Sequence, residues 1–389
     1  MERFALSRMK EWKENENRKP LIIRGARQVG KTWIMKTFGQ QYFEKTAYVN
    51  FDNNARMKQV FEGDLDIERL VLSISAETGV SIEAENTLII FDEVQEVPKA
   101  LTSLKYFYEN APQYAIVAAG SLLGVALHQG TSFPVGKVDF LDLYPLNFRE
   151  FLCAMGEKQF VSMLDSCDTQ MVTVFKTKYI ERLREYYFVG GMPEVVKDFS
   201  EKKDYNRVRA IQKNLINYYQ QDFSKHAEIK LVPRLNLVWN SIPMQLAKEN
   251  KKYIYGQVRE GSRAKDFELA IQWLLDCGLI HKVQRIQKPD LPLKAYIDFD
   301  AFKLFLVDIG LLIAMTDLDA KVIIEGNKIF TEFKGSLTEQ YILQQLISDV
   351  GVIPYYYSTQ NSKGEIDFLV QGKTSVIPIE VKAERSEER

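Results

Sequence analysis

Short runs of apolar residues alternate with longer segments of mixed polarity over the first 146 residues. Within each run the hydrophobicity is continuous, a pattern typical of strands that are buried on both faces. Such strands separated by helices predict an α/β fold with a mostly parallel sheet. We expect the strands at residues 20–25, 47–52, 87–93, 114–121 and 137–146.

The pattern changes three times in the rest of the chain. Helical periodicity dominates after residue 147, and a second helical and basic stretch begins near residue 231. Near the C-terminus a helix is expected at 338–347, followed by strands at 365–370 and 376–382. These changes predict four segments: an α/β core at 1–150, a helical lid-like region at 151–230, and two further domains at 231–324 and 325–389.

Composition narrows the class of protein. Of the 389 residues, 51 are Lys or Arg and 52 are Asp or Glu, so the net charge of −1 gives no field that would capture nucleic acid or an anionic membrane. No apolar stretch reaches the ~20 residues of a spanning helix, and the N-terminus lacks a signal-peptide core. Three scattered cysteines predict neither disulfides nor a zinc site. We therefore expect a cytoplasmic protein without a membrane partner.

The residues after the first expected strand match the phosphate-binding pattern GxxxxGK[ST], known as Walker A, and a helical segment follows them. Gly25 and Gly30 allow the backbone to curl with its N–H groups toward phosphate. Lys31 would reach the β- and γ-phosphates, and the Thr32 hydroxyl would be a ligand of Mg²⁺. The expected ATP-binding residues are Gly25, Ala26, Arg27, Gln28, Val29, Gly30, Lys31 and Thr32.

A second motif, of the Walker B type, closes the strand at 87–93. Four apolar residues precede Asp92 and Glu93, where the strand reaches the carboxyl edge of the sheet. Asp92 would hold Mg²⁺ through water, and Glu93 would orient and polarise the attacking water as a general base. The intervening strand at 47–52 and the Glu beside the Asp favour ATP hydrolysis over a small-molecule kinase.

Two weaker expectations concern the γ-phosphate. Ser121 ends the strand at 114–121 and would sense the γ-phosphate if that strand lies next to the phosphate-loop strand; an ordinary strand-end serine is the alternative. Efficient phosphoryl transfer also calls for an arginine finger. Arg149, Arg182 and Arg184 are the candidates, each with a helix-surface cation as its alternative.

These motifs resemble those of bacterial and archaeal AAA-type ATPases that carry a C-terminal domain of unknown function. The resemblance rests on GARQVGKT, LIIFDEVQ, AAGSLLG, YPLNFREFL and YYFVGGMPEVV in this order, and it continues through nearly the whole chain. It implies ATP binding, hydrolysis and a winged-helix-like segment in the middle of the chain.

The segment at 231–324 agrees with a winged helix in its pattern. Amphipathic helices are expected at 235–250 and 264–278, with a hairpin wing after them. Basic residues near 251–265 are interleaved with Tyr253 and Tyr255, which suits phosphate contacts and base stacking. Acidic residues dilute this patch, so DNA or RNA and a protein partner both stay open.

The C-terminal strands carry a D…ExK pattern, which is similar to that of restriction-endonuclease-like nucleases. Glu380 and Lys382 would share one strand face. If Gly372 and Lys373 centre the hairpin, Asp367 lies opposite Pro378 and diagonal to Glu380, near enough to share Mg²⁺. The expected nuclease-like residues are Glu339, Asp367, Glu380 and Lys382; only seven residues follow Lys382, so we expect this α+β fold to be incomplete.

The sequence thus predicts a P-loop NTPase sheet of the AAA type, followed by helical, winged-helix-like and nuclease-like segments. The expected function is Mg²⁺-dependent ATP hydrolysis that acts on, or is gated by, a nucleic-acid or protein partner. One alternative is a nucleotide-gated scaffold or nucleic-acid-binding switch with negligible turnover. The other is an ATP-regulated, metal-dependent nuclease. The oligomeric state stays open.

Overall fold

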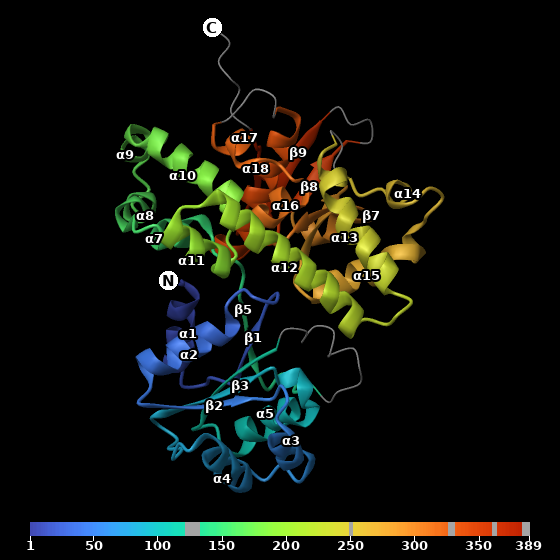
Figure 1. The fold of residues 1–389 in the computed structure, drawn as a ribbon. Coiled ribbons are helices and arrows are strands. Elements are labelled where there is room, and N and C mark those ends of the chain that lie inside the picture. The colour runs from blue at the N-terminus through green and yellow to red at the C-terminus, as the bar shows by residue number, and fades with distance from the viewer. Residues whose placement is uncertain (121–132, 249–251, 326–330, 360–363, 383–389) are drawn as a thin grey trace. The chain divides into compact units, whose positions relative to one another are not determined.

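The computed structural model describes residues 1–120, 133–248, 252–325, 331–359 and 364–382. The chain divides into two compact units. The N-terminal unit spans Arg3–Tyr144, and the C-terminal unit contains Met1–Glu2 and Pro145–Arg389. Figure 1 shows the elements of both units along the chain. Among the described residues, no helix combines the length and the hydrophobicity that crossing a bilayer requires.

The N-terminal unit is built on a five-stranded parallel sheet, as the apolar runs predict. Its order is β2-β3-β4-β1-β5, and every neighbouring pair is parallel. In this order β4 lies between β1 and β3, the two strands that carry the Walker motifs. The strands are β1 (Leu21–Arg24), β2 (Lys45–Asn50), β3 (Thr87–Asp92), β4 (Ala115–Ala119) and β5 (Asp139–Asp142).

Helices cover both faces of this sheet (Figure 1). One face bears α1 (Ala5–Glu14) and α2 (Lys31–Tyr42), and the other bears α3 (Ala55–Glu62), α4 (Ile67–Thr78) and α5 (Pro98–Asn110). A short 3₁₀ turn, η1 (Val94–Glu96), joins β3 to α5. Two covered faces explain why all six residues of β3 are buried.

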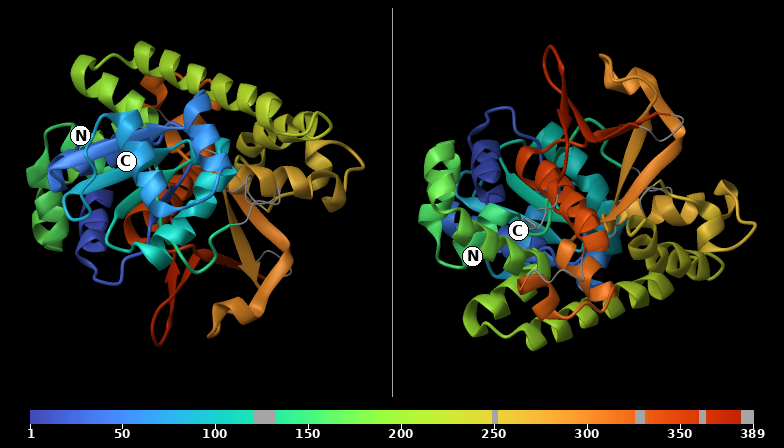
Figure 2. Two further views of the ribbon diagram at one scale, coloured as in Figure 1. Left: turned by 90° about the horizontal axis from the view of Figure 1, so that it is seen from below. Right: turned by 90° about the horizontal axis from the view of Figure 1, so that it is seen from above.

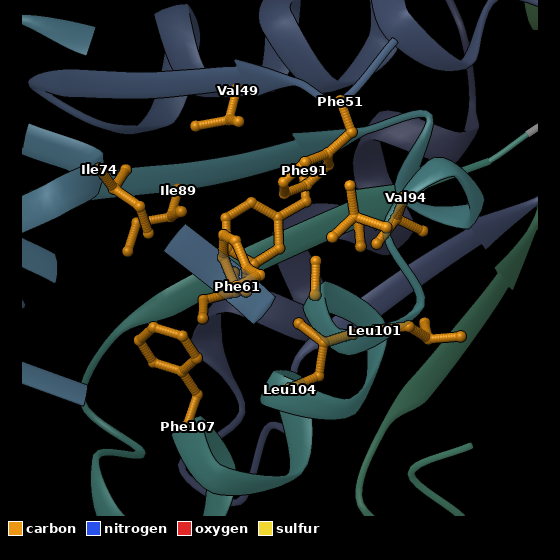
Figure 3. Close-up of a cluster of buried hydrophobic side chains, with 14 of the residues drawn as sticks. Val49, Phe51, Phe61, Ile74, Ile89, Phe91, Val94, Leu101, Leu104 and Phe107 are labelled. Carbon is orange, nitrogen blue, oxygen red and sulfur yellow. The ribbon is translucent and has the colours of Figure 1, made fainter. Parts of the chain in front are cut away.

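The core under α3, α4 and α5 consists of alternate strand residues and the apolar faces of these helices. Phe51, Phe61 and Phe91 pack edge to face there, with ring centroids 5.4–5.6 Å apart (Figure 3). This packing fixes β3 up to its last residue. Asp92 is therefore held at a rigid carboxyl edge of the sheet.

The C-terminal unit begins with a series of helices. Its long α12 contacts α11, α13 and α16. The helices are α7 (Phe148–Ala154), α8 (Lys158–Asp165), α9 (Thr169–Val174), α10 (Lys176–Val189), α11 (Pro193–Lys202), α12 (Tyr205–His226), α13 (Val232–Leu246), α14 (Tyr255–Val258), α15 (Ala264–Asp276), α16 (Ile309–Met315), α17 (Ala320–Ile324) and α18 (Thr331–Gln345).

A second five-stranded sheet, of mixed direction, completes this unit in the order β10-β9-β8-β6-β7. Figure 2 shows the β6–β7 hairpin in orange and the β9–β10 hairpin in red. The remaining elements are β6 (Ile280–Ile286), η2 (Leu293–Tyr296), β7 (Ile297–Leu306), the π-helical turn η4 (Leu346–Val350), β8 (Tyr355–Ser358), β9 (Glu365–Gln371) and β10 (Val376–Ile379).

The expected wing and the expected nuclease-like hairpin thus belong to one sheet, because β8 pairs with both β6 and β9. Strands from both sides of residue 324 therefore share backbone hydrogen bonds. The separation of 231–324 from 325–389 stays a prediction about domain boundaries.

Candidate nucleotide-binding site

The loop between β1 and α2 has the backbone that a phosphate loop requires. Gly25 has φ of 145° and Gly30 has φ of 95°, both in the region that favours glycine. A Cβ atom on Gly25 would lie 2.1 Å from the carbonyl oxygen of Leu143, which is backbone and cannot rotate away. Glycine at this position is thus required by both conformation and space.

Arg3 fastens this loop to the rest of the N-terminal unit. Its side chain is buried, with 5% of the residue exposed. Nη1 donates to the Val29 carbonyl at 3.0 Å, and Nη2 donates to the Tyr144 carbonyl at 2.7 Å. Sequence reasoning missed this residue, because an arginine before the first helix carries no motif that links it to the loop.

Lys31 begins α2 and lies against the loop that precedes it. Its Nζ donates to the carbonyl oxygens of Gly25 at 2.9 Å and Ala26 at 2.7 Å. Burial lowers the pKa of Lys31 to about 8, although Glu93 and Asp92 favour its charged form. The amine therefore has backbone oxygens as its hydrogen-bond acceptors, and an incoming phosphate can replace them.

The next residue of α2 joins the two Walker motifs. The hydroxyl of Thr32 donates to Oδ2 of Asp92 at 2.6 Å, across 60 residues of sequence. Asp92 is buried at the end of β3, with 3% exposed. The predicted Mg²⁺ ligands Thr32 and Asp92 are thus in direct contact.

Glu93 follows in a left-handed conformation, with φ of 52°. This is an uncommon conformation for a residue with a side chain and is often seen at functional sites. The backbone N–H of Glu93 donates to Oδ1 of Asp92 at 3.1 Å, and Nε2 of Gln95 donates to Oε2 of Glu93 at 2.7 Å. The glutamate carboxylate is thus held in place by a residue two positions later.

Tyr48, on the neighbouring strand β2, is a second residue that sequence reasoning missed. Its hydroxyl donates to Oδ2 of Asp92 at 2.9 Å. Burial, and then the nearby Asp92 carboxylate, raise the pKa of Tyr48. The parallel register places Tyr48 beside Ile90 and Asn50 beside Asp92. The sequence pattern predicts the strand, but this register is needed to find the contact.

These residues fit a nucleotide with Mg²⁺. The positive φ of Gly25 and Gly30 lets the loop curl around a phosphate, and the first N–H groups of α2 are at the end of the helix that favours anions. The Thr32 hydroxyl and the Asp92 carboxylate offer the oxygen ligands that Mg²⁺ prefers. Ser121 lies outside the described residues, while its strand β4 does pair with β1 as expected.

The candidate arginine fingers all belong to the C-terminal unit and have partners within it. Arg149 forms an ion pair with Asp349 at 3.0 Å and another with Asp165. Arg182 pairs with two glutamates, and Arg184 donates to a backbone carbonyl at 3.4 Å. Their role at a nucleotide stays a prediction.

The C-terminal strands depart from the expected register. β10 ends at Ile379, so Glu380 and Lys382 lie beyond it and not on one strand face. The turn is centred one residue later than expected, and Pro378 pairs with Leu369, not with Asp367. Oδ2 of Asp367 accepts the backbone N–H of Val381 at 2.7 Å, so this carboxylate holds the chain where it leaves the strand.

The expected nuclease-like residue Glu339 and the nearby Glu365 both lie close to a buried lysine. Nζ of Lys303, on β7, is 2.6 Å from Oε1 of Glu365 and 3.5 Å from Oε2 of Glu339. Burial opposes the charge, but Glu339 and Glu365 outweigh it and raise the pKa of Lys303. Among the described residues, no group of three His, Cys, Asp or Glu side chains is arranged to hold a metal ion.

The basic segment near residue 253 also differs from its expected form. Tyr253 is buried, with 3% exposed, and stacks on Phe302 at a centroid distance of 5.5 Å. Tyr255 packs on both rings. Tyr253 is thus part of the core and does not present its ring for base stacking.

Comparison with known proteins agrees with the geometry of the loop. Residues 17–152 match a family described as an AAA domain. Residues 180–322 match a domain of unknown function, DUF8612, and residues 334–389 match another, DUF4143. No curated protein matches the sequence.

Three solved structures are similar to this chain at low sequence identity. The Walker-type ATPase PABY2304 of Pyrococcus abyssi is 15% identical, with a TM-score of 0.49, and the match covers 81% of this chain and 95% of that one. Drosophila ORC bound to DNA is 12% identical (TM-score 0.30; 77% and 90% covered). Cdc6p from Pyrobaculum aerophilum is 10% identical (TM-score 0.28; 83% and 93% covered).

The AAA match and the loop describe the same part of the chain. It covers β1 with its phosphate loop, β3 with its acidic pair, and the parallel sheet that holds them. Residues 17–152 are therefore an AAA domain of the P-loop type, and two domains of unknown function follow it in the chain.

Proposed function

We propose that this protein hydrolyses ATP in a Mg²⁺-dependent reaction and uses the cycle to act on a nucleic-acid or protein partner. The observation that carries the proposal is the 2.6 Å contact between Thr32 and Asp92, with Lys31 beside it at the start of α2. This contact joins the nucleotide-binding and metal-binding halves of the site. A cytoplasmic location is part of the proposal.

Each residue has a distinct task in this mechanism. The ammonium group of Lys31 leaves the carbonyls of Gly25 and Ala26 and binds the β- and γ-phosphates. Thr32 and Asp92 would hold Mg²⁺, which would neutralise phosphate charge. Glu93 would orient a water molecule and accept its proton as the water oxygen bonds to the γ-phosphorus. The bond from that phosphorus to the β,γ-bridging oxygen breaks, so ADP and inorganic phosphate leave.

Steady-state ATP turnover tests the proposal in wild type, Lys31→Ala and Glu93→Gln. Lys31→Ala is expected to lose tight nucleotide binding, and Glu93→Gln to bind ATP without turnover. Glu96→Gln is the matched control, because Glu96 is an exposed glutamate on the adjoining turn. Normal turnover in both site variants would refute the assignment.

The same assay with duplex DNA, single-stranded DNA or neither tests the partner. Exposed basic residues remain in the segment after residue 252, and these support a phosphate-bearing partner. Stimulation by DNA that Glu93→Gln abolishes would favour a nucleic-acid-dependent motor or switch. Turnover that is indifferent to DNA would direct the search to proteins.

One observation favours a slow, nucleotide-gated switch as the second candidate function. Nε2 of Gln95 donates to one oxygen of the Glu93 carboxylate, and this hydrogen bond competes with the water that Glu93 would orient. A switch of this kind would show a single burst of hydrolysis and negligible steady-state turnover. Multiple rapid turnovers without a partner would exclude it.

We do not extend the proposal to nuclease activity. Lys303 already supplies positive charge to Glu339 and Glu365, and Glu380 and Lys382 lie beyond the end of β10. Incubation of supercoiled DNA with the protein in Mg²⁺ or Mn²⁺ is expected to leave the DNA intact. Nicking that Asp367→Asn abolishes would overturn this conclusion.

A further inference from the structure

The carboxylate of Asp92 receives more hydrogen bonds than the phosphate-loop pattern requires. Oδ2 accepts from the Thr32 hydroxyl at 2.6 Å and from the Tyr48 hydroxyl at 2.9 Å, while Oδ1 accepts from the Glu93 backbone at 3.1 Å. Three donors from three parts of the chain fix both oxygens. Of these, the Tyr48 hydroxyl is the donor that neither Walker motif contains.

The position of Tyr48 is itself fixed by its backbone and by a contact on its ring. β2 is paired with β3 along its whole length, so the backbone of Tyr48 is fixed beside Ile90. On its face, Nζ of Lys36 lies 3.7 Å from the ring centroid, within the range of a cation–π contact. Lys36 comes from α2, the helix that begins with Lys31. The strand pairing and the Lys36 contact therefore hold the Tyr48 hydroxyl against Asp92.

We propose that Tyr48 is a positioning residue for Asp92 and sets the affinity of the site for Mg²⁺·ATP. If the Thr32 oxygen became a ligand of Mg²⁺, the Tyr48 hydroxyl would still donate to Oδ2, so the orientation of the carboxylate does not depend on Thr32 alone. A carboxylate fixed in advance binds without first being ordered, which strengthens binding. This inference rests on the proposed function. It adds a residue that determines how strongly ATP affinity depends on Mg²⁺.

The decisive variant is Tyr48→Phe, since it keeps the ring and its contact with Lys36 and removes only the hydroxyl. A purely structural tyrosine would affect ATP binding equally with and without metal. A positioning tyrosine affects only the gain in affinity that Mg²⁺ provides. The matched control is Tyr114→Phe, because Tyr114 lies in the same unit, immediately before β4, and its ring packs on Phe107.

Calorimetric titration of ATP in Mg²⁺ and in EDTA measures this gain. Tyr48→Phe is expected to reduce the Mg²⁺-dependent gain about tenfold, the scale of one hydrogen bond to a charged group, with the affinity in EDTA unchanged. In turnover assays the KM for Mg²⁺·ATP is expected to rise more than kcat falls. Tyr114→Phe is expected to match wild type in both assays.

Two results would overturn the inference while leaving the proposed function intact. One is a wild-type Mg²⁺ gain in Tyr48→Phe, and the other is an equal loss of ATP affinity with and without the metal. A wild-type chain that binds no ATP would overturn the proposed function itself, and this inference with it. The two failures are thus separate observations.

Discussion

Two buried lysines of this protein lie near pairs of carboxylates, and they differ in what they contact. Lys31 in the N-terminal unit donates to backbone carbonyls, with Asp92 and Glu93 nearby. Lys303 in the C-terminal unit forms ion pairs with Glu339 and Glu365. Burial lowers the pKa of Lys31 to about 8, whereas the acids around Lys303 raise its pKa despite burial.

We propose that this difference distinguishes a ligand-binding site from a cluster that stabilises the fold. The carbonyl acceptors of Lys31 are neutral, so an anionic phosphate can replace them with a gain in charge pairing. Lys303 already has its counter-ions, and a further ligand would have to break a buried pair. The same residue types near each other are therefore weak evidence of a site until their partners are known.

The largest expected effect is on kcat, and it should differ between a glutamate of the N-terminal unit, Glu93, and one of the C-terminal unit, Glu339. Glu93→Gln removes the base that orients water, so kcat is expected to fall by about 10²–10⁴ while ATP binding is kept. Glu339→Gln is expected to leave kcat within about twofold, because it changes only the Lys303 cluster. Turnover and ATP titration on both variants check this. Equal losses of kcat would remove the distinction.

Lys303→Met is expected to lower the free energy of unfolding of the C-terminal unit by roughly 3–5 kcal/mol. It leaves the buried acid Glu339 without its cation, and Glu365 loses a partner at 2.6 Å. Urea unfolding, followed by circular dichroism, measures the change. Lys321→Met, at an exposed helix position, is the control. A Lys303→Met protein as stable as this control would show that the pairs contribute little.

Gln95→Ala is expected to lower kcat by about tenfold with little change in KM. Its amide holds Oε2 of Glu93 at 2.7 Å, so its loss disorders the base without touching the phosphate loop. Steady-state kinetics at saturating Mg²⁺·ATP measures the effect. A rise in kcat would mean that Gln95 restrains Glu93, which would favour the nucleotide-gated switch.

The pH dependence of the two lysines is expected to have opposite signs. The folded pKa of Lys31, about 8, is below its ordinary value of 10.5, so the unfolded chain binds more protons between these values. The contribution of Lys31 to stability thus rises with pH in that window. The pKa of Lys303 is raised, so its stabilisation is full below pH 10.5 and is lost as pH rises through the folded pKa.

ATP binding provides the readout for Lys31, because the phosphates need its protonated form. The ATP affinity of wild type is expected to fall up to about tenfold per pH unit above pH 8. Calorimetry between pH 7 and 9 checks this, and Lys303→Met in the same series is expected to follow wild type. A flat profile for wild type would contradict the lowered pKa.

The signals that predict the N-terminal site are local in the sequence. The apolar runs give the strands, and a glycine loop between a strand and a helix has few other uses. Asp92 and Glu93 are predicted site residues because they come at the end of a buried strand, where ligands of parallel sheets bind. These expectations need only the order of elements along the chain, and the sheet order agrees with them.

The residues that sequence reasoning missed depend on register and on distant contacts. Tyr48 reaches Asp92 only because β2 pairs with β3 in one particular register, and Arg3, just before α1, reaches Val29 across 26 residues of sequence. Near the C-terminus the turn is centred one residue later than expected, so Pro378 is not opposite Asp367. The sequence also did not predict that Lys303, from another strand, pairs with Glu365. No local pattern records such pairings.

The central claim is that Lys31, and not Lys303, binds the phosphates of ATP. Calorimetric titration of Mg²⁺·ATP into wild type, Lys31→Ala and Lys303→Met at pH 7 tests it most directly. We predict wild-type affinity for folded Lys303→Met and a loss of at least about 100-fold for Lys31→Ala. Unchanged affinity in Lys31→Ala would contradict the claim.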